Sequence, residues 1–348
     1  MSLSSATMTV AMTAKTTADA SAMNVFEGAD SIRDFLNPEN APPLPLVELP
    51  DRLNPFRADG VRIFAKMASL TPLLNIKSLP VWNMLVEAEN SGRLREVHTL
   101  VENSSGNTAL SLAVMAGLFG IGAVTAFVPF DIAPGKLDLL RIAGVQPYLK
   151  RGVPGEASGI AEAQQMGRAP GYFNPSQYEN EANPGAYEKW FAPEIWKQTR
   201  GKLTVFAAGL GTAGTLMGCS RYFRKISEKV TVVGSICAPS QAVPGVRTRA
   251  HLGEIEFDWE PAADAIIEVG TKESFLLSLR LCRSGLMAGP SSGFTLAGLQ
   301  HFLEARKAEG GLDTLRNAEG EIVSAFVCSD TPLPYLDKYS THLDAEEF

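Results

Sequence analysis

The order of strands, turns and helices repeats in two stretches of this chain and limits the folds that it can adopt. Each stretch has a strand pattern, a tight polar or glycine-rich turn, a helical pattern and a second strand pattern, over residues 97–128 and 203–233. Repeated strand–helix–strand order is typical of parallel sheets with helices on their faces. We therefore predict an α/β fold, with sites at the carboxyl ends of the strands.

Composition and charge exclude several classes of protein. The 348 residues are 45% hydrophobic and 20% charged, which suits a sizeable core and about two domains. The net charge is −7 and no run of Lys and Arg appears, so we expect no nucleic-acid partner. The longest apolar stretch, residues 109–130, is interrupted by glycines. We therefore expect no membrane span and a cytoplasmic protein.

The cysteines are too far apart to suggest a metal or redox site. The chain has four of them, Cys219, Cys237, Cys282 and Cys328. A zinc knuckle or a thioredoxin-like site would need a CxxC pair. The spacing predicts reduced thiols and no bound metal.

The first 45 residues are predicted to form a disordered or extended leader. Residues 1–22 are rich in Ser, Thr, Ala and Met but lack the basic start and apolar block of a signal peptide. Residues 37–50 contain five prolines, which remove amide donors and favour an extended chain. We expect order to begin near Leu46.

A glycine-rich turn, Gly209–Thr215, lies between a buried strand pattern and a helical one. Small residues there let backbone amides converge on an anion at the helix N-terminus, so the turn predicts a phosphate site. Such turns also serve tight packing. A dinucleotide fold is the rival interpretation, because residues 209–214 read GxGxxG, but no acidic residue ends the next strand, residues 230–235, to bind a ribose.

Two further segments are ambiguous when taken alone. The turn Asn103–Thr108 offers hydroxyls, an amide side chain and backbone amides at a helix start, which suits a carboxylate, but Ser and Asn are also the preferred helix N-caps. Lys77 stands among apolar residues before a helical pattern, whereas most lysines extend to water.

The order and spacing of these segments resemble those of the fold-type II pyridoxal phosphate (PLP) enzymes, in the cysteine synthase and cystathionine β-synthase group. The segments that carry the resemblance are Pro45–Leu49, Val61–Lys66, Ile76–Lys77, Ser104–Thr108, Lys136–Gly144, Gln177–Pro184, Pro193–Thr199, Gly209–Thr215 and Gly289–Gly293. The resemblance implies a homodimer of two-domain, tryptophan synthase β-like subunits, with PLP in the cleft. The smaller domain would be residues 71–181 and the larger 46–70 with 182–348.

The resemblance also implies a role for each matching residue. Lys77 would form the internal Schiff base and act as the catalytic base, Asn107 would bond the PLP 3′ oxygen, and Ser291 would face the pyridine nitrogen. The phosphate would be bound by Gly211, Thr212, Ala213, Gly214 and Thr215. The substrate carboxylate would be bound by Ser104, Ser105, Gly106, Asn107, Thr108 and Gln177.

The activity that the resemblance implies is β-replacement on an activated serine through an aminoacrylate, as when cysteine synthase joins O-acetylserine and sulfide. A serine at the pyridine nitrogen favours β-elimination chemistry, and an apolar setting would lower the Lys77 pKa so that it can act as a base. Three alternatives stay open: a β-eliminating lyase or specialised β-synthase on another amino acid, a catalytically weak PLP-binding regulatory paralogue, and a nicotinamide dehydrogenase.

Some residues depart from the group's pattern. Ser78 and Leu79 replace an Asp-Arg pair that usually follows the lysine, and Ala213 and Ala109 replace glycines. In the stretch that corresponds to a substrate-closing loop, Arg247 and Arg249 are either contacts for a second carboxylate or solvated surface residues.

Overall fold

The computed structural model describes residues 24–104, 106–130, 132, 134–151, 158–227 and 229–347. Contacts divide the chain into two parts, which meet after Pro43 in the sequence. In the first part, helix α2 (Ser31–Leu36) forms where an extended or disordered leader was predicted. Its apolar residues Ile32, Phe35 and Leu36 have helical spacing, a signal that the prolines after it obscured. Residues 1–23 lie outside the described residues.

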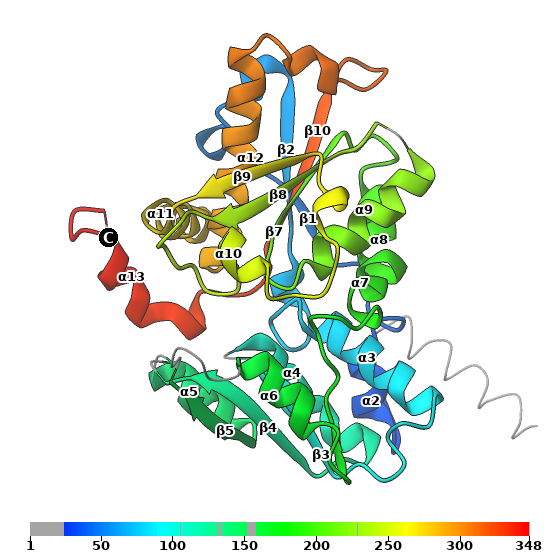
Figure 1. Cartoon of the computed structure of the whole chain (residues 1–348). Helices are drawn as coiled ribbons and strands as arrows, with labels where there is room; N and C mark the ends of the chain where they lie inside the picture. Colours follow the sequence, from blue (N-terminus) through cyan, green and yellow to red (C-terminus); the bar gives the residue numbers. More distant parts are fainter. Residues whose placement is uncertain are drawn as a thin grey trace, which may run out of the picture. The chain divides into compact units, whose positions relative to one another are not determined.

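The second part contains a six-stranded sheet whose strands are parallel except at one edge (Figure 1). Only β1 runs antiparallel, against β2. The strands, in spatial order, are β1 (Leu46–Glu48), β2 (Val61–Lys66), β10 (Ile322–Val327), β7 (Val205–Gly209), β8 (Thr231–Cys237) and β9 (Ala265–Val269).

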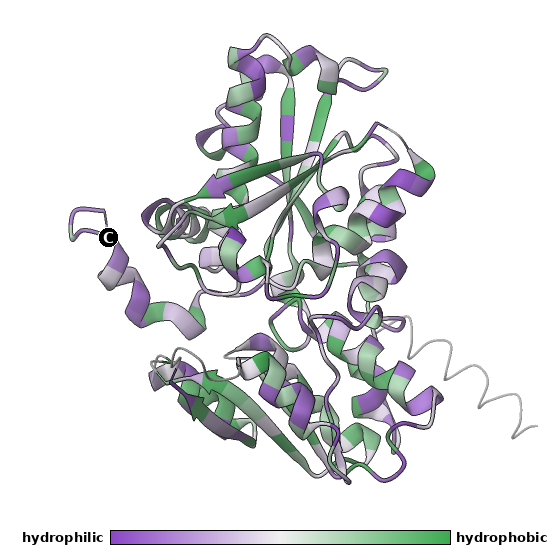
Figure 2. Ribbon diagram, in the orientation of Figure 1, coloured by the Kyte–Doolittle hydropathy of each residue, from purple (hydrophilic) through white to green (hydrophobic). Residues whose placement is uncertain are grey.

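Both faces of this sheet are buried. Along β7, Phe206 and Ala208 belong to one core, whereas Val205 and Ala207 belong to the other. This alternation follows from the two-residue period of a strand. The first core includes α7 (Ala182–Ala186), α8 (Ala192–Gln198) and α9 (Gly214–Ile226), and the second includes α11 (Thr271–Arg283) and α12 (Pro290–Ala308). Figure 2 shows the apolar strands between helices with polar outer faces.

A second sheet has four parallel strands, in the order β5 (Val145–Lys150), β4 (Ala123–Pro129), β3 (Thr99–Asn103) and β6 (Tyr172–Phe173). On β4, Ala126 and Val128 pack with Leu140 in one core, and Phe127 packs with Ala163 in the other. The helices on this sheet are α4 (Asn107–Ala116), α5 (Pro134–Ile142) and α6 (Gly159–Met166). Helix α3 (Ser78–Asn90) packs against α4 and α7.

The predicted α/β class is confirmed, with two mostly parallel sheets flanked by helices. The strands expected near residues 61–67, 97–102 and 203–208 form within two residues of those bounds. The bounds proposed for two domains stay a prediction. The other α-helices in the described residues are short, α10 (Arg249–Leu252) and α13 (Leu336–His342). Over the described ranges, every helix falls short of the length and apolar character needed to cross a membrane.

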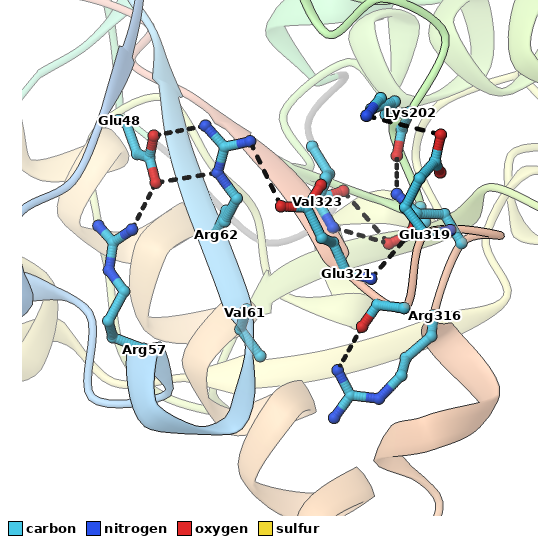
Figure 3. A network of polar contacts seen from close by, with 12 residues as sticks. Glu48, Arg57, Val61, Arg62, Lys202, Arg316, Glu319, Glu321 and Val323 are labelled. Carbon is cyan, nitrogen blue, oxygen red and sulfur yellow. Dashed lines mark hydrogen bonds and ion pairs between the residues drawn. The ribbon is translucent and has the colours of Figure 1, made fainter.

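Ion pairs hold the outer strands of the six-stranded sheet. Figure 3 shows the Glu48 carboxylate between the guanidinium groups of Arg57 and Arg62, and Arg62 also reaches Glu321 at 3.8 Å. These side chains are about one-third exposed, so each pair contributes only about 0.2–1 kcal/mol.

A fully buried ammonium group at the end of β2 is expected to contribute more to stability than these exposed ion pairs. The Lys66 side chain has 0% exposure and donates to the Leu44 carbonyl, Glu194 and Gln198 at 2.7, 2.5 and 2.8 Å. Burial lowers the pKa of Lys66, while the neighbouring Glu194 carboxylate opposes that shift. The ammonium therefore depends on its partners to stay charged inside the protein.

We predict that Glu194→Ala lowers the free energy of unfolding by about 3 kcal/mol, because it leaves a buried ammonium without its counter-charge. Urea denaturation measures this value. The matched control is Glu260→Ala, which breaks the exposed Arg249–Glu260 pair and should cost less than about 1 kcal/mol. Equal losses for the two variants would contradict the buried-pair argument.

Candidate active site

The carboxyl ends of strands from both sheets meet at two adjoining pockets. The glycine turn follows β7, Asn103 ends β3, and residues 329–330 follow β10. Lys77, Asn107, Gly211 and Thr212 line both pockets. The edge predicted from repeated strand–helix order is therefore where the candidate residues gather.

The first pocket contains the turn that starts α4. The candidate residues that line it are Lys77, Ser104, Gly106, Asn107, Thr108, Gln177, Gly211 and Thr212. The second pocket is lined by all residues of the glycine turn except Leu210. The candidate residues that line it are Lys77, Asn107, Gly211, Thr212, Ala213, Gly214, Thr215 and Ser291. Every candidate that is described lines one of the two pockets; Ser105 lies outside the described residues.

The loop before α3 positions Lys77 without the Asp-Arg pair that the sequence lacks. The Asn75 side chain accepts hydrogen bonds from the Lys77 amide at 3.0 Å and from the Ser111 hydroxyl at 3.2 Å. The Ile76 amide donates to the Ser329 carbonyl at 2.8 Å. Leu74 adopts φ 55°, a left-handed conformation that is rare outside glycine and asparagine. An amide side chain and a backbone link thus hold the Lys77 loop in this chain.

The Lys77 amine lies inside the pocket and is not a solvated surface group. Its Nζ is 3.5 Å from the Thr212 hydroxyl. Burial, followed by the positive charge of Arg247, lowers the pKa of Lys77 to about 8, although the Asp330 carboxylate opposes the shift. A larger share of this amine is therefore neutral near pH 7 than for an ordinary lysine.

The glycine turn leaves backbone donors exposed to the second pocket. Among the described residues, the amides of residues 211–216 donate no hydrogen bond to the protein, as is expected of donors at a helix start. A β-carbon on Gly211 would lie 2.4 Å from the Gly245 carbonyl oxygen, and one on Gly214 would lie 2.2 Å from the Asn183 side chain. Only glycine fits at these two positions, so free amides can face an anion.

Ala213 shows that the turn is constrained. It stands where the group usually has glycine, and it adopts φ 63°. A left-handed alanine costs roughly 1 kcal/mol or more, which the surrounding contacts must offset. The turn therefore places an alanine in a conformation that favours glycine.

The turn that starts α4 fits both interpretations made from the sequence, a carboxylate site and polar side chains that satisfy amides at a helix start. The Ser104 hydroxyl accepts from the Gly106 and Ala109 amides at 3.3 and 3.4 Å, so it caps the helix. Thr108 donates to the Gln177 side chain at 2.7 Å, and Gln177 donates to the Asn103 carbonyl at 3.1 Å. The turn is both a helix cap and a wall of the first pocket.

Asp330 is a buried carboxylate that sequence reasoning missed. It accepts hydrogen bonds from Asn107 at 2.8 Å, Tyr335 at 2.6 Å and Ser291 at 3.4 Å. Burial raises the pKa of Asp330, and the donors from Tyr335 and Asn107 oppose that shift. Its only sequence signal is its place directly after a buried strand, where sites of α/β folds usually form.

Six further described residues line the first pocket without having been chosen as site residues: Lys136, Tyr178, Gly245, Val246, Arg247 and Tyr335. The sequence had raised Arg247 and Arg249 together. The structure separates them, because Arg247 lines the pocket, whereas Arg249 is 54% exposed and pairs with Glu260.

The four cysteines are free thiols and form no disulfide among the described residues. Within the described ranges, His, Cys, Asp and Glu side chains form no group of three that could bind a metal ion.

The sequence model of the pyridoxal-phosphate dependent enzyme family matches residues 40–315. Cysteine synthase A of Escherichia coli (strain K12) is 32% identical over 264 residues, which cover 71% of this chain and 81% of that protein. Cysteine synthase B of Salmonella typhimurium (strain LT2) is 30% identical over 288 residues, covering 82% and 89%.

A solved structure, that of an O-ureido-L-serine synthase, superposes with a TM-score of 0.71 at 24% identity, over 87% of this chain and 93% of that one. This likeness shows the fold. The family match covers more than half of the chain and includes the residues from Lys77 to Ser291. The chain therefore belongs to the fold-type II pyridoxal-phosphate dependent enzymes of the cysteine synthase group, and its cofactor is pyridoxal 5′-phosphate.

Proposed function

We propose that this enzyme catalyses β-replacement on an activated L-serine, such as O-acetyl-L-serine with sulfide. Lys77 would hold the cofactor and act as the base. The main support is that Lys77, the glycine turn and the turn that starts α4 line the same pocket. The cysteine synthases among its relatives support β-replacement at the level of the family.

The residues present fit pyridoxal phosphate. The cofactor has an aldehyde, which reacts with a neutral amine, and a phosphate, which needs hydrogen-bond donors. Lys77 offers the amine, and the free amides of residues 211–216 offer the donors. The close approach of Gly211 to the Gly245 carbonyl leaves no room for a side chain that would cover these amides. When bound, the cofactor supplies an electron-withdrawing ring that acidifies the α-proton of an amino acid.

The remaining candidates would orient the two ligands. Ser291 would face the ring nitrogen with a hydroxyl, and Asn107 would bond the 3′ oxygen. The Asp330 carboxylate, which accepts from both side chains, would hold them in position. Among the described residues, the amides of residues 107 and 108 have no hydrogen-bond acceptor. With the Ser104 and Thr108 side chains, they would bind the substrate α-carboxylate at the start of α4.

Lys77 suits the transfer of a proton at the α-carbon. With a pKa of about 8, roughly one in ten of its amines is neutral at pH 7, against fewer than roughly one in a thousand for an ordinary lysine. A base is most effective when its pKa lies near the working pH. Burial and the Arg247 charge therefore prepare the amine for this role.

We predict that Lys77→Ala abolishes covalent attachment of the cofactor. After borohydride reduction and digestion, mass spectrometry of the wild type should show the added mass on the peptide that contains residue 77. Lys202→Ala is the matched control, because the Lys202 ammonium lies in a surface pair with Glu319. Attachment at a different lysine in the wild type would contradict the assignment.

We also predict that the rate of cofactor attachment to the apoprotein rises with pH around a midpoint near 8. Only the neutral amine attacks an aldehyde, and a lowered pKa means that Lys77 loses its proton at a lower pH than an ordinary lysine. Stopped-flow absorbance from pH 6 to 10 would measure the profile. A midpoint near 10.5, the ordinary lysine value, would contradict the buried setting.

The proposed reaction itself is tested with the purified holoenzyme. With O-acetyl-L-serine and sulfide we expect cysteine, identified by mass spectrometry, and no cysteine from Lys77→Ala. Pyruvate with and without sulfide would instead favour a β-eliminating lyase. A cofactor absorbance that ignores every amino acid tested would favour a regulatory paralogue without activity. Homodimeric assembly stays a prediction.

A further inference from the structure

The first pocket is positively charged. Its lining includes the cationic side chains of Lys77, Lys136 and Arg247, and none of the described residues that line it is Asp or Glu. Cofactor attachment would engage the Lys77 amine, which would then not be free to bind an anionic group of the substrate. Two cations would then remain, in a site where a low dielectric strengthens their attraction for anions.

These two cations lie on the substrate side of the site. The second pocket, which contains the whole turn from Gly211 to Thr215 and Ser291, is lined by neither Lys136 nor Arg247. Both instead share the first pocket with the turn that starts α4. Their charges are therefore placed to meet the substrate, and the free amides of residues 211–216 are placed to meet the cofactor phosphate.

Lys136 is placed to bind the α-carboxylate that every amino-acid substrate carries. A β-carbon on Gly106 would lie 3.6 Å from the Lys136 Nζ, so this ammonium is beside the turn that starts α4. It lies 4.5 Å from the centre of the Tyr335 ring, and among the described residues it forms no ion pair. Lys136 would then meet the α-carboxylate of the substrate, in addition to the Asp330 and Asp337 carboxylates whose charges already act on it.

Arg247 is the cation that remains, and it is held in place before any ligand binds. Its guanidinium lies 4.9 Å from the centre of the Tyr178 ring and donates to the His251 carbonyl at 3.0 Å. Its protein counter-charge, Glu254, is 3.5 Å away but 49% exposed, so water screens that pair. A fixed guanidinium in a pocket whose described lining has no carboxylate is suited to a carboxylate or phosphate.

We infer that the amino-acid substrate carries a second anionic group, a carboxylate or a phosphate on its side chain, and that Arg247 binds it. This inference rests on the proposed function and narrows it. O-Acetyl-L-serine would then be a poorer substrate than an activated serine with an anionic β-substituent.

The test uses the holoenzyme and three probes: O-acetyl-L-serine, O-succinyl-L-serine and O-phospho-L-serine. Titrations followed by cofactor absorbance give Kd without sulfide, and kcat/KM is measured with sulfide. We expect at least one anionic probe to bind more tightly than the neutral one. In Arg247→Gln that preference should fall by at least about 10-fold, the range expected for loss of one charge-assisted hydrogen bond.

The matched control is Arg249→Gln, two residues away, whose side chain pairs with Glu260 outside the pocket. It should keep the wild-type preference. Arg247→Lys keeps the charge but loses the planar fork, so its preference should lie between those of the wild type and Arg247→Gln. The two anionic probes distinguish a phosphate from a carboxylate.

Three outcomes would overturn the inference. One is a wild type that converts all three probes without preference, which leaves the proposed function intact. The second is an equal loss for neutral and anionic probes in Arg247→Gln. The third is weaker binding of the cofactor in Arg247→Gln with an unchanged preference among probes. If no probe alters the cofactor absorbance or yields product in the wild type, the proposed function fails as well.

Discussion

The link between the lysine loop and the end of β10 is the contact on which the site depends. The Ile76 amide donates to the Ser329 carbonyl, and Asn75 forms a β-bridge with Asp330. Because β10 pairs with β7, which leads into the glycine turn, this link fixes Lys77 relative to that turn. An amine and a set of free amides more than a hundred residues apart are thereby held on one framework.

Asp330 also connects the end of β10 to other segments that line the site. A buried carboxylate must be satisfied by donors, and the donors here come from Asn107 at the start of α4, Ser291 at the start of α12 and Tyr335 near the C-terminus. The residue that pairs with the lysine loop through its backbone therefore also joins three other segments through its side chain. Its requirement for hydrogen bonds helps to explain why these segments converge.

The positive charge of Arg247 in the first pocket has two effects. Arg247 adds to the effect of burial in lowering the pKa of Lys77, which increases the neutral fraction of that amine. The same charge attracts anions into the pocket. The chain has a net charge of −7, so the local excess of cations reflects tertiary arrangement and could not be read from composition.

The sequence by itself determined the fold class, because the two-residue and helical periods of its apolar residues define the strands and helices of parallel α/β units. It also identified the glycine turn, since small residues lie between a strand pattern and a helical one, and the structure then shows that Gly211 and Gly214 have no room for a side chain. Lys77 was found only through a resemblance to a known family, because a lysine among apolar residues is ambiguous without its surroundings. Tertiary structure alone decided that Asp330 lies beneath the site and that Arg247 lines it while Arg249 does not. Burial and charge environment depend on segments that are far apart in the chain, and no local pattern encodes them.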